Sequence, residues 1–300
     1  GLYNKGYDYV LKDSETYAHI SFAITNLTKN DIILNETSGN VVIALDFDDG
    51  FISNKLINSQ MTLDFAYTLY LLLNNNPAIE KNQIKHYVAK WFVMSTLTSR
   101  YIGSPESQMD FDIKRIREKG FMTFFKEVEE AELSDTFWNV GLVQNLETQV
   151  INSPFFNVFL AAQIYEGNNA LFSNGTKVGY LITLMGDVHH IFPKQYLRKN
   201  GYDEKRLYNQ IANFTYLDTQ VNKGISDDAP NVYFKNAIEA CENGKTLYGN
   251  IADTATLRQN LQENCIPESI VDMDYSNYPD FLASRRKLMA KKIRNYYKNL

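Results

Sequence analysis

Hydrophobic residues recur at helical spacing through the middle of the chain. Met61, Phe65, Leu69 and Leu72 lie three or four residues apart, and this pattern stops at Asn74–Pro77. A second helix is predicted over Lys81–Thr98, with Trp91 facing a core. The same periodicity predicts further helices over residues 107–118, 122–131, 134–148 and 155–165. Residues 59–175 are therefore predicted to form a helical domain, whereas residues 1–58 give only a poorly defined N-terminal segment.

The pattern changes after residue 175. The segment Thr176–Met185 is apolar, with Val178, Tyr180, Ile182 and Leu184 at every second position, which predicts an extended strand. Asn213–Leu217 is a second, shorter strand candidate, and Asp218 is a good N-cap for a helix that would run through Lys223. Pro230 is placed to open another helix.

A long C-terminal helix is predicted over Tyr278–Asn299. It carries an apolar stripe, and its other face holds most of its basic residues. The predicted fold class is thus mainly α with a small β component. We expect a helical bundle over residues 59–175, followed by an α+β domain over residues 176–300.

Composition limits the classes of protein that need to be considered. The chain has 300 residues, 44% of them hydrophobic, which is enough for one large or two modest domains. No run of eighteen apolar residues occurs, so no membrane association is expected. Cys241 and Cys265 are far apart, which argues against a zinc knuckle or a disulfide framework and favours a cytoplasmic location. The net charge of −5 disfavours a surface that binds nucleic acid everywhere, but it permits a local basic patch. Because the first residue is Gly rather than Met, we expect either a processed protein or an excised piece of a longer one, and we favour the second.

Two adjacent histidines, His189 and His190, carry the candidate chemistry. They fall at the end of the predicted strand, and Pro193 follows them closely, so a bend in the chain can bring both toward one site. Imidazole accepts a proton near neutral pH and also binds divalent metals. Hydrolysis of a phosphodiester needs both a base and a metal ion, because water must be deprotonated and the charge on the phosphoryl oxygens must be neutralised.

The run from Asp187 through His189, His190 and Pro193, followed by Asn213 and then Asn222, resembles the HNH (ββα-metal) nuclease motif in its His-Asn-Asn form. The longer pattern, including Asn222-Lys223-Gly224-Ile225-Ser226, is similar to the C-terminal HNH domain of GmrSD-like restriction and phage-defence proteins. The segment 99–107 also resembles part of the helical region that precedes that domain. The resemblance implies that residues 176–300 form an HNH nuclease domain with flanking C-terminal helices.

The resemblance also implies a role for each matching residue. His190 would be the general base that activates water, and Asn213 would tie down the neighbouring loop and orient His190. His189 and Asn222 would hold a divalent metal, for which Mg²⁺ is the first expectation. A histidine at position 189 also allows Mn²⁺, Ni²⁺ or Zn²⁺.

The predicted substrate is DNA, cut by metal-dependent phosphodiester hydrolysis in defence against foreign or modified DNA. Basic residues on the last predicted helices are candidates for contacts to the DNA backbone: Lys223, Arg285, Arg286, Lys291 and Lys292. Similar proteins carry an upstream nucleotide-hydrolysing domain with an Asp-Gly-Gln-Gln-Arg signature. That string is missing from this sequence, so either such a domain lies outside this chain, as we expect, or the protein lacks it. No nucleotide hydrolysis is predicted for this chain.

Two other interpretations stay open. The domain can be a catalytically inactive HNH fold that binds nucleic acid or regulates a partner. Separately, Val41–Leu45 followed by Asp46 and Asp48 resembles the nucleophile motif of haloacid-dehalogenase-like phosphatases. Helices rather than alternating βα units follow it, so a strand that ends in an acidic turn is the favoured interpretation.

Overall fold

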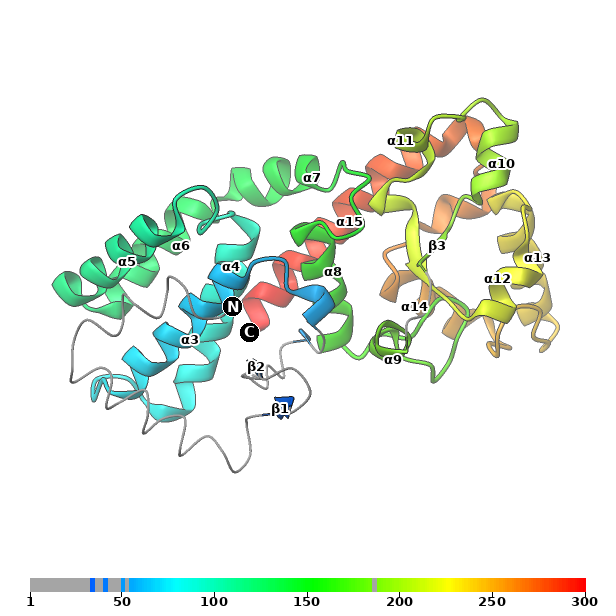
Figure 1. Ribbon diagram of the computed structural model, residues 1–300. Coiled ribbons are helices and arrows are strands. Elements are labelled where there is room, and N and C mark those ends of the chain that lie inside the picture. Colours follow the sequence, from blue (N-terminus) through cyan, green and yellow to red (C-terminus); the bar gives the residue numbers. More distant parts are fainter. Residues whose placement is uncertain (1–32, 36–39, 43–49, 52–53, 185–187) are drawn as a thin grey trace. The chain divides into compact units, whose positions relative to one another are not determined.

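The structure is a computed structural model that describes residues 33–35, 40–42, 50–51, 54–184 and 188–300 (Figure 1). The described part of residues 1–58 includes an antiparallel pair, β1 (Ile33–Asn35) and β2 (Asn40–Val42). The acidic motif of Asp46 and Asp48 lies outside the described residues, and so does Asp187.

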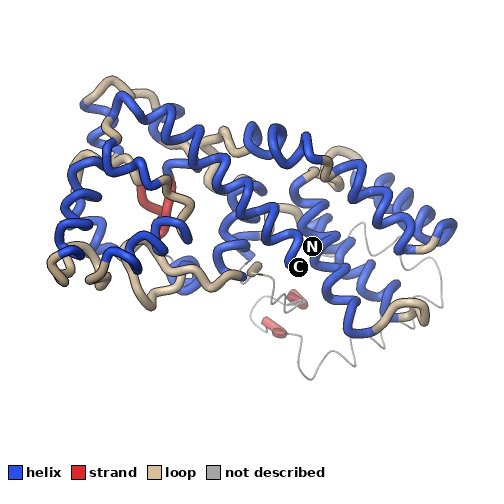
Figure 2. The backbone as a smooth tube through the Cα atoms, turned by 180° about the vertical axis from the view of Figure 1, so that it is seen from behind, coloured by secondary structure: helices blue, strands red, loops and turns tan. Residues whose placement is uncertain are grey.

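The described chain is mostly helical, with very little sheet, which confirms the prediction of a mainly α protein (Figure 2). Its residues divide into two compact units. The first contains Ile57–Ser134, and the second contains Asp135–Asn299 together with the segment 49–56. The units thus meet at residue 134, earlier than the boundary predicted near residue 175, because the helices of 135–165 pack with the C-terminal helix.

The first unit contains four of the predicted helices, namely α3 (Gln60–Asn74), α4 (Ile84–Leu97), α5 (Pro105–Lys119) and α6 (Phe121–Glu132). The Ser59 side chain accepts a hydrogen bond from the Thr62 backbone at 3.2 Å and so caps α3. Trp91 of α4 is fully buried and contacts the rings of Phe65 and Phe124. Aromatic packing of this kind supplies the core that the periodic apolar residues predict.

The segment 99–107 joins α4 to α5 through a buried polar network. Arg100 donates two hydrogen bonds to the Asp112 carboxylate, at 2.8 and 2.6 Å. The Tyr101 hydroxyl donates to the same carboxylate at 2.8 Å and accepts from the Trp91 indole at 2.9 Å. Because Asp112 is fully buried, these bonds offset the cost of removing its charge from water. The hydrogen bonds of Arg100 and Tyr101 therefore give this segment a structural role, because they attach it to α5.

The second unit surrounds the long helix α15 (Tyr278–Asn299), which has the predicted bounds. Its apolar stripe includes Leu282, Met289 and Ile293, all buried. The other elements of the unit that follow residue 134 are the π-helical turn Phe137–Gly141 (η3), α7 (Leu142–Asn145), α8 (Pro154–Tyr165), α9 (Val178–Thr183), β3 (Val188–His190), α10 (Lys194–Lys199), α11 (Lys205–Tyr208), η4 (Ile211–Asn213), β4 (Phe214–Tyr216), α12 (Thr219–Ile225), α13 (Pro230–Glu242), α14 (Thr254–Glu263), η5 (Glu268–Asp272) and η6 (Tyr275–Asn277).

The predicted strand over Thr176–Met185 is wrong, because Val178–Thr183 within it forms the short helix α9. Val178 and Ile182 are buried, whereas Tyr180 and Leu184 are 58% and 60% exposed. The apolar residues thus form two pairs with a spacing of four, one on each face of a helix. An alternating pattern made only of apolar residues fits both a strand and a helix over so short a distance.

The short sheet of the second unit pairs β3 with β4 in antiparallel orientation, and α12 follows β4 directly (Figure 1). The Asp218 side chain accepts from the Gln220 backbone at 2.7 Å, which confirms its predicted role as the N-cap of α12. Pro230 opens α13, as predicted. Among the described residues, no helix combines the length and apolar character needed to cross a membrane.

Candidate active site

The sheet of β3 and β4 places the two histidines on different sides. His189 is paired with Thr215, and His190 is paired with Phe214. Since paired residues share a face and neighbouring residues alternate, His189 lies on the face of Thr215 and His190 on the face of Phe214. His189 is 8% exposed, whereas His190 is half-buried. The two histidines therefore have different surroundings, although they are adjacent in sequence.

The His190 ring is held by an asparagine that the sequence reasoning did not select. Its Nε2 atom lies 2.8 Å from Oδ1 of Asn209, which follows α11. The ring also meets Phe214 edge-on at 5.0 Å between centroids, and Tyr208 lies at 6.3 Å. Because an amide oxygen only accepts, Nε2 carries the proton and donates it, which leaves the Nδ1 lone pair as the basic atom of the ring.

Burial is the main cause that lowers the pKa of His190 below its ordinary value of 6.5. The hydrogen bond with Asn209 opposes this effect, whereas the nearby charges of Lys194 and His189 add to it. A lowered pKa keeps the imidazole neutral at pH 7, and a neutral imidazole is the form that accepts a proton from water.

Asn213 is fully buried and holds the backbone beside His190 in place. Its Oδ1 accepts from the Phe192 N–H at 2.8 Å, and its Nδ2 donates to the Phe192 carbonyl at 3.1 Å and to the Tyr208 carbonyl at 3.3 Å. These bonds join the loop after β3 to the end of α11, as the predicted role in tying down the loop requires. The side chain hydrogen-bonded to the His190 ring is nevertheless Asn209, whereas the Asn213 side chain bonds to backbone groups.

The predicted metal ligands lie on two different elements, His189 on β3 and Asn222 on α12. His189 lies on the opposite face of the sheet, where its neighbour Thr215 donates to Asn264 at 3.4 Å. Asn222 is half-buried on α12. The described residues contain no group of three or more His, Cys, Asp or Glu side chains that could hold a metal ion. One imidazole and one amide form a donor set that matches Mn²⁺, Ni²⁺ or Zn²⁺ better than Mg²⁺, which prefers oxygen ligands.

Two of the side chains predicted to contact DNA, Arg285 and Lys292, are buried in the fold. Arg285 is fully buried and donates to the carbonyls of Ala212 at 2.9 Å, Phe214 at 2.6 Å and Asn264 at 3.0 Å. Burial lowers the pKa of Arg285 to about 10, so the guanidinium stays charged at pH 7. Lys292 is 9% exposed and binds other side chains of its own unit.

The other predicted DNA contacts differ in their availability. Arg286 forms an ion pair with Glu147 at 3.1 Å and donates to Gln210 at 3.2 Å, which occupies its guanidinium. Lys223 and Lys291 are exposed. These two lysines are therefore accessible to a ligand, and their contacts with DNA remain predictions.

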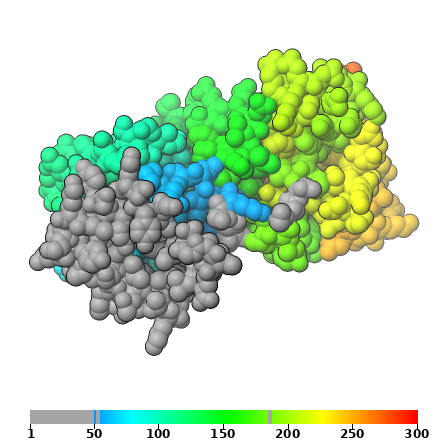
Figure 3. All heavy atoms as spheres, viewed as in Figure 1, coloured from blue at the N-terminus to red at the C-terminus, as the bar shows by residue number. Residues whose placement is uncertain are grey.

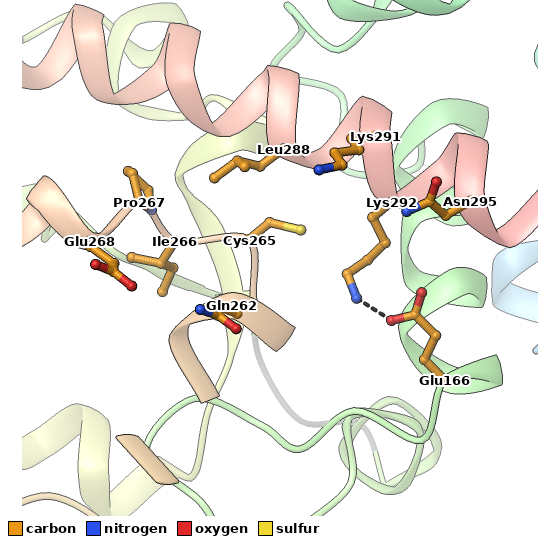
Figure 4. Close-up of a pocket in the computed structure, with 10 residues that line it drawn as sticks. All are labelled: Glu166, Gln262, Cys265, Ile266, Pro267, Glu268, Leu288, Lys291, Lys292 and Asn295. Atoms are coloured by element: carbon orange, nitrogen blue, oxygen red, sulfur yellow. Dashed lines mark hydrogen bonds and ion pairs between the residues drawn. The ribbon is translucent and has the colours of Figure 1, made fainter. Parts of the chain in front are cut away.

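A cavity of about 340 Å³ lies beside α15, away from the residues predicted for catalysis (Figure 4). Its wall includes Cys265, Leu288, Lys291 and Lys292, and Lys292 is paired there with Glu166. Burial raises the pKa of the Cys265 thiol to about 11, so this sulfur is protonated and a weak nucleophile at pH 7. None of the histidines and asparagines of the candidate site lines this cavity.

Comparisons with known proteins give one distant relative. An uncharacterized protein of Methanocaldococcus jannaschii is 27% identical over 222 residues, which cover 69% of this chain and 36% of that protein. The chain therefore spans little more than a third of its relative's length. No family model matches the chain, and no solved structure matches it. The relative's name carries no activity, so the comparisons assign none to this chain.

Proposed function

We propose that the second unit is an HNH-type DNA endonuclease centre in which His190 is the general base. The observation that supports this best is the state of the His190 ring. Asn209 binds Nε2 at 2.8 Å, and burial lowers the pKa, so a neutral ring has Nδ1 available for a proton. The order of β3, β4 and α12 is also the order of strand, strand and helix that the resemblance implies.

In the proposed reaction, Nδ1 of His190 takes a proton from a water molecule. The water oxygen forms a bond to phosphorus while the bond from phosphorus to the leaving oxygen breaks. Asn209 continues to accept from Nε2–H in the protonated ring, and this bond grows stronger once the ring is charged. Asn213 keeps the loop after β3 in place while the proton moves.

A bound divalent cation would neutralise charge on the phosphoryl and leaving oxygens. Its ligands, proposed as His189 and Asn222, rest on the resemblance alone. The same holds for a role in restricting foreign or modified DNA, for an upstream nucleotide-hydrolysing partner domain and for a cytoplasmic location.

A second candidate function is an inactive HNH-type module that binds nucleic acid or regulates a partner. The observation that favours it is the separation of His189 from His190 on opposite faces of the sheet. An inactive module needs no metal ion beside His190, so the separation of the two histidines is compatible with it.

The two functions are separated by a plasmid-cleavage assay with Mg²⁺, Mn²⁺ or no metal. The protein is compared with His190→Ala and with a control, His86→Ala, which changes a half-buried histidine of the first unit. We expect metal-dependent cleavage that His190→Ala abolishes and His86→Ala retains. Cleavage that survives in His190→Ala would refute the assignment of the base. DNA binding without cleavage under any metal would favour the inactive module.

A further inference from the structure

Three exposed cations on α10 and α11 have no ion-pair partner among the described residues, namely Lys194, Arg198 and Lys205. Their two basic neighbours differ, because Lys199 is paired with Asp227 and Arg206 with Glu204. Residues 194–206 contain five basic and two acidic side chains, a net formal charge of +3 in a chain whose total is −5. This segment is therefore a local positive region on a protein of opposite net charge.

One of these cations, Lys194, lies close to His190. Lys194 Nζ is 5.3 Å from the centroid of the Tyr208 ring, which in turn lies 6.3 Å from the His190 ring. Arg198 follows Lys194 by four residues on α10, so the two side chains share one face of the helix. α11 contacts α10 and brings Lys205 to the same part of the unit. All three side chains are exposed, and Figure 3 shows the yellow-green atoms of the chain near residue 200 at the surface of the molecule.

The long helix α15 offers less free charge than its sequence implies. Arg285 is bound to three backbone carbonyls, Arg286 is paired with Glu147, and Lys292 with Glu166. A cation that already has a partner in its own chain gains less free energy from binding a phosphate. The unpaired cations of α10 and α11 are thus better placed than the paired cations of α15 to meet a polyanion.

We propose that Lys194, Arg198 and Lys205 form a surface, here called the α10–α11 surface, that binds the phosphate backbone of the nucleic acid acted on at His190. This inference rests on the proposed function and names the part of the unit that holds its substrate. Duplex DNA carries one negative charge per about 1.7 Å of its axis, so several cations on one surface can each meet a phosphate. The contacts fix the position of the backbone and carry no sequence preference.

The test measures binding separately from cutting. The protein with His190→Ala is titrated with a labelled duplex of about 30 base pairs, without divalent metal, from about 50 to 300 mM KCl. The same protein with Lys194→Ala, Arg198→Ala and Lys205→Ala is compared with a control. In the control, Lys245→Ala, Arg258→Ala and Lys298→Ala remove the same charge from exposed cations elsewhere in the unit.

Three lost phosphate contacts reduce the slope of log K against log salt by about 2.7 and weaken binding about 100- to 500-fold near 0.1 M salt. The control is expected to lose less than about threefold, because screening weakens distant charges. Equal losses in both triple variants, or no measurable DNA binding by the parent protein, would overturn the inference. Thermal unfolding of each variant, and single substitutions to Gln, separate lost contacts from misfolding.

Failure of this inference is distinguishable from failure of the proposed function. If the native protein cuts plasmid but the α10–α11 variant binds as tightly as its parent, the surface is refuted and the nuclease stands. If the native protein never cuts while the α10–α11 variant alone loses binding, the surface stands and the catalytic proposal fails.

Discussion

Arg285 provides the sharpest prediction, because its position in the sequence and its contacts in the structure indicate different roles. A basic residue on a charged helix is expected to face solvent, yet Arg285 donates to the carbonyls of Ala212, Phe214 and Asn264. We predict that Arg285→Met, which keeps much of the volume, destabilises the second unit and affects DNA binding only through the fold.

The size of the effect follows from the groups left behind. Ile191 donates to the Asn213 carbonyl at 2.8 Å, so the next pair, His190 and Phe214, is a pair without ladder hydrogen bonds. The Phe214 carbonyl therefore points away from β3 and depends on Arg285. Each buried carbonyl left without a donor costs about 1–3 kcal/mol, and breaking a buried charged network costs about 3–5 kcal/mol in total. For a unit of this size, such a loss lowers the melting temperature by about 6–20 °C.

The measurement is calorimetry of the native protein, of Arg285→Met and of a control, Arg258→Met, which removes an exposed arginine. Salt-dependent DNA binding is measured on the same samples below their melting temperatures. The control is expected to change stability by less than about 0.5 kcal/mol. A melting temperature of Arg285→Met within 2 °C of the native value, together with a lost phosphate contact, would refute the structural role.

Three further predictions concern the site and the first unit. Asn209→Ala removes the bond to Nε2 and is expected to lower kcat about 10- to 100-fold, measured by plasmid cleavage. Because the pKa of His190 is below 6.5 in the folded protein, the unfolded chain binds this proton more tightly. The free energy of unfolding should therefore fall as the pH drops through and below 6.5, and it should fall less in His190→Ala. Urea unfolding in the presence of a chelator measures this difference. Asp112→Ala leaves Arg100 without its buried partner and should cost the first unit about 3–5 kcal/mol.

Each of these three predictions has its own contrary result. Asn209→Ala with unchanged kcat would show that the ring needs no orienting bond, and Asn243→Ala, at an exposed site, is the control. A stability profile that is the same with and without His190 would show that its burial does not affect protonation. An Asp112→Ala protein with native calorimetric behaviour would contradict the importance of the buried network.

The helices of this protein are largely predictable from sequence because local signals mark them. Ser59 and Asp218 cap their helices, Pro230 opens one, and the apolar stripe of α15 gives that helix its full length. Thr176–Met185 escaped prediction because apolar residues at every second position also fit a short helix. The helices α10, α11 and α14 went unpredicted, and the first two are too short to show a clear period.

The candidate site is less predictable, since its contacts depend on elements that are distant in sequence. Asn209 was missed because nothing in the run around it marks it as the partner of a ring nineteen residues earlier. The burial of Arg285 was not predicted because its carbonyl partners lie as far as 73 residues away, and a sequence shows charge but not burial. Asn213 was found only through its place in a motif, and the structure supplies the physical reason for that place.

The Asn213 side chain forms the hydrogen bonds that a peptide group of a neighbouring strand would form. It accepts from the N–H and donates to the carbonyl of one residue, Phe192, much as a neighbouring strand would. This reciprocity sets the range of replacements that selection can accept. Aspartate would place an oxygen against a carbonyl, leucine would satisfy neither group, and glutamine would carry the amide one methylene too far. We therefore expect substitutions of Asn213 to be rare, even in related proteins that no longer use His190 for catalysis.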